Sequence, residues 1–147
     1  MTESADSYEF DLTVPGDRQF LAFVRTAIGH LARDAGFSEI ETGKVEMAVD
    51  EACANVIEHA YRAMRPKPSV RIRCQLCPHH FVVEIVDQGE AFDFNAYTPP
   101  SFPEHWEQGN SRGIGLFLIQ KCVDEVTYRR VGDRENEMRL VKNVGEG

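Results

Sequence analysis

Apolar and polar residues alternate at the start of the chain. The apolar residues share one side of an extended segment: Tyr8, Phe10, Leu12 and Val14. A period of two is typical of a strand with one buried face, so residues 8–14 are predicted to form a half-buried strand. The polar residues 1–7 before it are predicted to form a disordered tail.

Helical periodicity follows this strand. Apolar residues recur at helical spacing after the turn at 15–17, and Gly36 ends the pattern, as a glycine just past a helix commonly does. Ser38 and Glu41 form a capping box, a residue pair that satisfies free backbone N–H groups at a helix start. The second helix is predicted to run to about Met64, because the prolines that follow cannot continue a helix.

Strands dominate the rest of the chain. Residues 69–77 and 81–87 have the pattern of a hairpin, and a second hairpin is predicted from residues 125–131 and 137–142. A helical apolar pattern at 113–123 precedes this second hairpin.

The order of these elements predicts the fold class. Helices and strands segregate along the chain, which favours an α+β fold: a two-layer α/β sandwich with a mixed, mostly antiparallel sheet and helices on one face. Residues 8–147 are expected to form a single domain. Residues 88–112 show no period and contain several prolines and glycines, and irregular stretches of this length are often lids.

Composition excludes some classes of function. Lys and Arg number 16 against 24 Asp and Glu, a net charge of −8, which argues against direct nucleic-acid binding. No apolar run approaches the roughly 18 residues of a membrane helix, so no membrane association is expected. The 4 cysteines are too few for a secreted disulfide scaffold, and we expect a reducing, cytoplasmic location.

The second predicted helix carries a polar line beside its apolar face. Glu51, Asn55 and His59 follow one another at four-residue spacing, so they line up on a regular helix. The Glu51 carboxylate is a candidate base, and the Asn55 side-chain oxygen is a hard ligand that suits Mg²⁺. The alternative is a solvated helix flank with no chemical role.

An aspartate ends the strand at 81–87. Asp87 shares the more apolar face of this strand by the two-residue period, so it is predicted to point toward the helices. A buried carboxylate needs a donor, which the exocyclic amine of a ligand could supply. Gly89 lets the backbone approach such a ligand closely. The alternative is an aspartate that caps its own turn.

Two glycines flank the predicted start of the helix at 113–123. Gly113 and Gly115 expose backbone N–H groups at a helix N-terminus, which favours anion binding, and Arg112 adds a charged donor for phosphate. Neither a P-loop nor a Rossmann fingerprint is present at this site. The alternative is a flexible loop that meets a helix.

These three segments resemble the boxes of a known ATP-binding fold. Residues 51–61 resemble the N box, residues 87–93 the first glycine box, and residues 112–116 with 124–126 the second glycine box of the fold shared by gyrase, MutL and histidine kinases. The Glu-x-x-x-Asn-x-x-x-His-Ala-Tyr form and the short length are similar to one branch, the bacterial anti-sigma-factor serine/threonine kinases. Ala91 departs from this pattern, since a second glycine is frequent there.

The resemblance implies roles for individual residues. Glu51 would be the general base for a substrate hydroxyl, Asn55 would hold Mg²⁺, and Asp87 and Gly89 would bind the adenine of ATP. The phosphate contacts would come from the second glycine box: Arg112, Gly113, Ile114, Gly115 and Leu116.

The resemblance also implies partners. A kinase of this branch sequesters a sigma factor and phosphorylates a small anti-sigma-antagonist protein, and homodimers are common in the family. The alternative is a nucleotide-binding module that sequesters its partner without phosphoryl transfer.

A cysteine and histidine cluster near the first hairpin turn has two interpretations. Cys74, Cys77, His79 and His80 are of the types that bind Zn²⁺, but only one such cluster exists and Cys74 shares a strand face with apolar residues. Ordinary packing and exposed thiols are the favoured interpretation.

Overall fold

A five-stranded antiparallel sheet forms one layer of the protein, and helices form the other. The computed structural model describes residues 7–91 and 111–144. Its elements are β1 (Tyr8–Val14), the 3₁₀ turn η1 (Arg18–Phe20), α1 (Leu21–Asp34), α2 (Glu39–Asn55), the π-helical turn η2 (Val56–Ala60), β2 (Val70–Leu76), β3 (His80–Asp87), α4 (Ser111–Cys122), β4 (Glu125–Val131) and β5 (Glu135–Asn143). Most of the predicted tail and most of the predicted lid lie outside the described residues.

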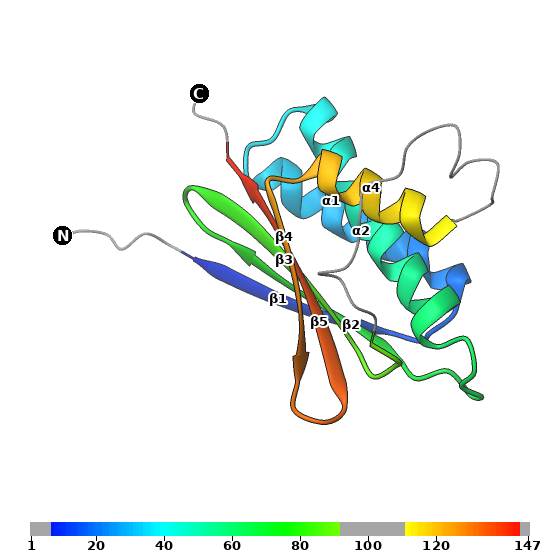
Figure 1. Cartoon of the computed structure of the whole chain (residues 1–147). Coiled ribbons are helices and arrows are strands. Elements are labelled where there is room, and N and C mark those ends of the chain that lie inside the picture. The colour runs from blue at the N-terminus through cyan, green and yellow to red at the C-terminus, as the bar shows by residue number, and fades with distance from the viewer. Residues whose placement is uncertain (1–6, 92–110, 145–147) are drawn as a thin grey trace.

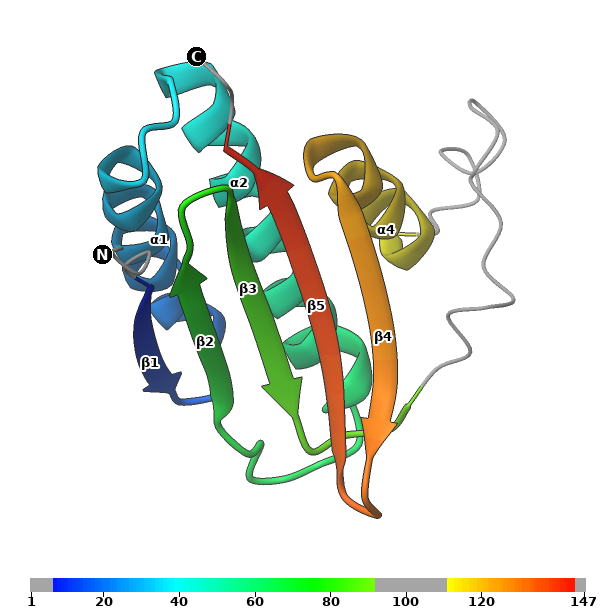
Figure 2. The same ribbon diagram turned by 90° about the vertical axis from the view of Figure 1, so that its left-hand side faces the viewer.

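The strands follow the order β1-β2-β3-β5-β4, with every neighbouring pair antiparallel. Figure 2 shows the helices behind the sheet, with α1 near β1 and β2, α2 behind the centre and α4 near β4. The predicted α+β sandwich is therefore confirmed, and the described part of the sheet contains no parallel pair. Among the described residues, no helix is both long and apolar enough to cross a membrane.

The core lies between the sheet and the helices. Its largest fully buried side chains include Tyr61, Phe81, Ile72 and Ile119. The Phe37 ring packs edge-on against Phe81, with centroids 5.9 Å apart and planes at 74°. Both predicted helix starts are capped: Asp17 accepts a bond from Gln19 N at 3.0 Å before η1, and Ser38 accepts one from Glu41 N at 3.1 Å before α2.

The first strand is less covered than predicted. Val14 is buried, but Tyr8 and Phe10 are 56% and 44% exposed. These residues lie on the helix side of the sheet, yet β1 is the edge strand and α1 leaves a groove of about 530 Å³ beside it. The alternation predicted the strand correctly, whereas the burial of its apolar face was wrong over its first half.

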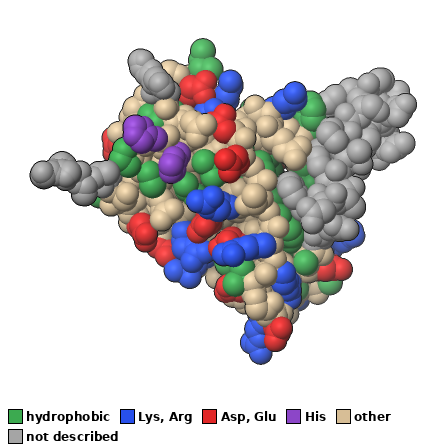
Figure 3. All heavy atoms as spheres, turned by 60° about the vertical axis from the view of Figure 1, so that its left-hand side comes forward, with side chains coloured by type: hydrophobic (Ala, Val, Ile, Leu, Met, Phe, Trp, Pro, Cys, Tyr) green, Lys and Arg blue, Asp and Glu red, His purple; other side chains and the backbone are tan. Residues whose placement is uncertain are grey.

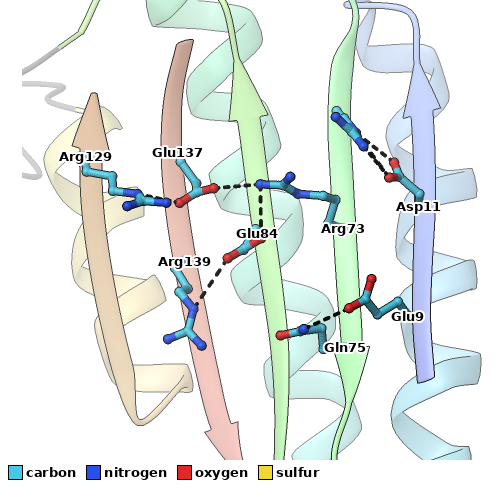
Figure 4. Close-up of polar contacts among 9 residues, drawn as sticks. Glu9, Asp11, Arg73, Gln75, Glu84, Arg129, Glu137 and Arg139 are labelled. Carbon is cyan, nitrogen blue, oxygen red and sulfur yellow. Dashed lines mark hydrogen bonds and ion pairs between the residues drawn. The ribbon is translucent and has the colours of Figure 1, made fainter. Parts of the chain in front are cut away.

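The other face of the sheet is open and charged, as Figure 3 shows. Arg73 bonds Glu137 at 2.7 Å and Glu84 at 3.2 Å, and Arg129 bonds Glu137 at 2.8 Å (Figure 4). The Glu137 side chain is only 6% exposed, so its charge is compensated from both sides. The charged side chains on this face suit contact with water, and none of the described helices covers it (Figure 2).

Candidate functional site

The two polar side chains predicted as base and metal ligand lie on α2 and face α4. A Cβ atom added to Gly115 of α4 would lie 3.0 Å from Glu51 Oε1 and 3.4 Å from Asn55 Nδ2. A side chain at this position would therefore be in tight contact with Glu51 and would require it to shift slightly. The structure brings together Glu51, Asn55 and the second glycine box, as predicted.

Burial changes the chemistry of both α2 residues. Asn55 is 9% exposed, and its Nδ2 has no hydrogen-bond partner among the described residues. A buried amide without a partner is costly, so this atom is a candidate for ligand contact. Desolvation, followed by the nearby charge of Asp50, raises the pKa of Glu51 above its usual value, and Arg18 opposes this shift.

The polar line predicted to continue to His59 is interrupted. The α-helix ends at Asn55 and a π-helical turn follows, closed by a bond from Tyr61 N to Val56 O at 2.9 Å. A π turn holds more residues than an α turn, so His59 is displaced from the line of Glu51 and Asn55. The predicted end at about Met64 is therefore wrong, because the α-helix ends at Asn55 and the π-helical turn ends at Ala60.

The end of the π-helical turn η2 is explained by what its last carbonyl binds. Ala60 O accepts a hydrogen bond from Glu90 N at 3.1 Å, so the segment after β3 replaces the next helical turn. A Cβ on Gly89 would lie 2.5 Å from Ala60 O, which shows how closely the two backbones approach. We call residues 87–91 the strand-end loop.

Asp87 anchors the strand-end loop from inside. It is 4% exposed and lies on the helix side of β3, as predicted. Its Oδ1 accepts bonds from Gly89 N at 2.8 Å and from Asn136 Nδ2 at 2.9 Å. The alternative of an aspartate that caps its own turn is thus realised in part, but the cap does not exclude contact with a ligand. Ala91, at the end of this loop, is exposed.

The remaining predicted residues lie at the start of α4. Leu116 is 3% exposed, Gly115 is buried and Ile114 is half-buried. Arg112 and Gly113 belong to the first turn of α4, but the surroundings of their side-chain positions lie outside the described part of the chain.

A small cavity lies between α2, η2 and the sheet, beside Asn55 and Asp87. It measures about 20 Å³, room for about one water molecule. Its walls come from α2, η2 and the adjoining strands: Ala52, Asn55, Val56, Ala60, Ile85, Asp87, Tyr128 and Met138. A planar ring is larger than one water molecule, so it can enter this cavity only if the walls move apart.

Three residues that contact the strand-end loop were not predicted. Tyr61 OH donates to Ser69 O at 2.7 Å and accepts from Gln88 N at 3.0 Å. Tyr61 belongs to the N box, so the motif offered a signal for it. Asn136 and Arg130 belong to the second hairpin, and no local pattern marks them.

The cysteine and histidine cluster does not converge on one point in the described structure. Cys74 is buried in the core, where desolvation raises its pKa to about 12. Among the described residues, no group of three or more His, Cys, Asp or Glu side chains could hold a metal ion.

Comparisons with known proteins agree on one family. A family model described as "Histidine kinase-like ATPase domain" matches residues 14–142. A protein named "Serine-protein kinase RsbW" from Bacillus licheniformis is 29% identical over 130 residues, covering 86% of this chain and 80% of that protein. Its namesake from Staphylococcus epidermidis is 27% identical over 147 residues, covering 95% and 91%.

A solved structure has the same fold. It is described as the RsbU and RsbW domains of Rv1364c from Mycobacterium tuberculosis, and it matches with a TM-score of 0.66 at 15% identity. The match covers 92% of this chain and 32% of that one. At this identity the likeness supports the architecture alone.

Proposed function

The chain belongs to the family of histidine kinase-like ATPase domains, and on this premise we propose that it is an ATP-dependent protein serine/threonine kinase. The observation that carries the proposal is the convergence of Glu51 and Asn55 on Gly115, at 3.0 and 3.4 Å from its Cβ position. A base, an amide and a helix start that exposes backbone N–H groups are the parts that phosphoryl transfer needs. The relatives named serine-protein kinase support this choice.

The residues of the site fit ATP and Mg²⁺. Asn55 Oδ1 is a hard oxygen of the kind that Mg²⁺ binds. The Nδ2 atom of the same buried amide has no hydrogen-bond partner among the described residues, so it is available to a ligand oxygen. Mg²⁺ would neutralise phosphate charge when bound. Backbone N–H groups of residues 112–116 bind phosphate oxygens, and Asp87 accepts a bond from the adenine amine.

Glu51 acts as the base. It accepts the proton of a serine or threonine hydroxyl at a carboxylate oxygen as the hydroxyl oxygen bonds to the γ-phosphorus of ATP. The bond from that phosphorus to the β,γ-bridging oxygen breaks, and ADP leaves. Its raised pKa favours this role, because a base works best when its pKa lies close to the working pH.

Calorimetric titration with ATP, with and without Mg²⁺, tests the nucleotide site. We expect binding that depends on Mg²⁺, and loss of that dependence in Asn55→Ala. Absence of binding at millimolar ATP would contradict the proposal.

Glu51→Gln separates catalysis from binding. We expect this variant to bind ATP normally but to lose about 10²–10⁴-fold in transfer of labelled γ-phosphate to purified antagonist proteins of the host. Glu46→Gln is the matched control, since Glu46 lies on the same helix but packs toward Gly29 of α1. Transfer that survives in Glu51→Gln would exclude Glu51 as the base.

The resemblance of the boxes to anti-sigma kinases supports the partners we propose. The phosphoryl acceptor is an anti-sigma-antagonist protein, and the chain sequesters a sigma factor in the cytoplasm. The net charge of −8 complements a basic partner surface. Size-exclusion chromatography of the purified chain with each sigma factor of its host tests this, and failure to co-elute with any of them would contradict it.

We also propose that a second copy of the chain covers the groove beside β1. This strand pairs with β2 alone among the described strands, so its outer edge has unpaired backbone groups. Phe10 and Phe23 are 44% and 59% exposed beside the groove. Light scattering should show a wild-type dimer and a Phe23→Glu monomer, with Ile40→Glu, 74% exposed on α2, as the control. A wild-type monomer would contradict the proposal.

A further inference from the structure

Three polar side chains form one row across three neighbouring strands. Asp87 of β3 pairs in register with Asn136 of β5, which pairs with Arg130 of β4. All three lie on the helix side of the sheet, at the end where the strand-end loop begins. Asn136 is fully buried, although its amide is polar.

The amide of Asn136 is held in one orientation. Arg130 Nη1 donates to Asn136 Oδ1 at 2.9 Å, and a guanidinium has no acceptor, so this bond fixes the amide oxygen on the Arg130 side. The amide nitrogen must then face the loop, where it donates to Asp87 Oδ1 and to Gly89 O, both at 2.9 Å.

Arg130 is itself fixed at the loop. It donates to Asp133 O at 2.5 Å within its own hairpin and to Gly89 O at 3.3 Å. The β4–β5 hairpin therefore fixes both the carboxylate of Asp87 and the backbone two residues beyond it.

We propose that Arg130 and Asn136 are positioning residues that make the Asp87 site specific for a purine with an amine, rather than a carbonyl, at C6. This inference rests on the proposed function, in which Asp87 accepts a bond from that amine. With Asn136 donating, Asp87 remains an acceptor that matches the amine of adenine and opposes the ring carbonyl of guanine. Without Arg130 the amide can turn its oxygen toward Asp87, which repels the carboxylate and removes its fixed position.

The ratio of affinities for ATP and GTP, measured by calorimetry on the full chain with Mg²⁺, tests this role. We expect Arg130→Met to lower the ratio about tenfold, the effect of losing one charged hydrogen bond. Arg130→Lys should restore part of it, because lysine still donates to the amide oxygen. A purely structural role would weaken both nucleotides alike and leave the ratio unchanged.

Arg129→Met is the matched control. Arg129 precedes Arg130 on β4 but bonds Glu137 on the open face at 2.8 Å, away from the loop (Figure 4). We expect the wild-type ratio in this variant. Asn136→Asp, which replaces the donating amide with a second carboxylate, should lower the ratio at least as much as Arg130→Met.

The outcomes separate the two proposals. A wild-type chain that binds neither nucleotide overturns the proposed function and this inference with it. A wild-type chain that prefers ATP, with the same preference in Arg130→Met and Asn136→Asp, overturns this inference alone.

Discussion

Replacing Gly89 with alanine tests how closely the strand-end loop docks on the end of the N-box helix. The added Cβ would lie 2.5 Å from Ala60 O, 2.7 Å from its carbonyl carbon and 2.8 Å from its Cβ. Favourable carbon contacts lie at about 3.5–4.0 Å, so the overlap is about 0.7 Å even at the most distant of these atoms. Two of the three are backbone atoms, which cannot move aside by a rotamer change.

The expected size of the effect follows from this geometry. Overpacking of this kind typically costs about 1–3 kcal/mol of unfolding free energy. At roughly 2–4 °C per kcal/mol for a chain of this length, Gly89→Ala should lower the melting temperature measurably. The shift of the loop should also weaken the bond of Glu90 N to Ala60 O, now 3.1 Å.

Gly43→Ala is the control, and we expect it to change the unfolding free energy in the opposite direction. Gly43 lies within α2, and an added Cβ would meet nothing within 4 Å. Alanine is favoured over glycine in a helix by about 0.8–1.0 kcal/mol, so Gly43→Ala should be more stable than the wild type.

Urea unfolding followed by circular dichroism measures both changes. The reasoning is refuted if Gly89→Ala unfolds at the same urea concentration as the wild type, because the two backbones would then have room to separate freely. If Gly43→Ala were less stable than the wild type, helix propensity would not determine the direction of the stability change at this open helix position.

Three further predictions concern stability. Tyr61→Phe should lose about 1–3 kcal/mol in urea unfolding, because a backbone carbonyl and the Gln88 N–H lose their shared partner; unchanged stability would contradict the role of the hydroxyl. Burial raises the pKa of Glu51 in the folded chain, so the ionised carboxylate destabilises the fold above the unfolded pKa of about 4.3. In urea unfolding, Glu51→Gln should therefore be more stable than the wild type at pH 7 and lose this advantage near about pH 3. A hydrogen bond from Lys142 lowers the pKa of Glu41 in the folded chain. The pair therefore stabilises the fold fully above the unfolded pKa of about 4.3, and this stabilisation is lost as the pH falls through the lower pKa of the folded chain. Unfolding midpoints between about pH 2 and 6 should therefore vary less with pH in Lys142→Met, and an unchanged profile would contradict this.

Features fixed by neighbours in the chain were predictable from the sequence. The N-cap at Ser38 and the inward direction of Asp87 follow from local spacing, and the structure confirms both. The reciprocal half of the predicted capping box is not formed, because the Glu41 carboxylate pairs with Lys142 instead. The π turn was not predictable, because a bond from Tyr61 N to Val56 O leaves no mark in the pattern of apolar residues.

Features fixed by strand register were beyond the sequence. Asn136 reaches Asp87 across a sequence separation of 49, and only the pairing of β3 with β5 places them side by side. The exposure of Phe10 has a related cause, since alternation identifies the apolar face of a strand but not whether a helix covers it. The position of β1 at the sheet edge decides that.

The turn of the second hairpin has a consequence for the two neighbouring arginines. Val131 pairs with Glu135, and Gly132 in the turn between them has a φ of 65°, which favours glycine. Because successive side chains on a strand point to opposite faces, a slip of one residue between β4 and β5 would exchange Arg129 and Arg130. The length of this turn therefore determines which of two chemically identical side chains reaches each face, and an insertion there would alter both faces without changing either strand's composition.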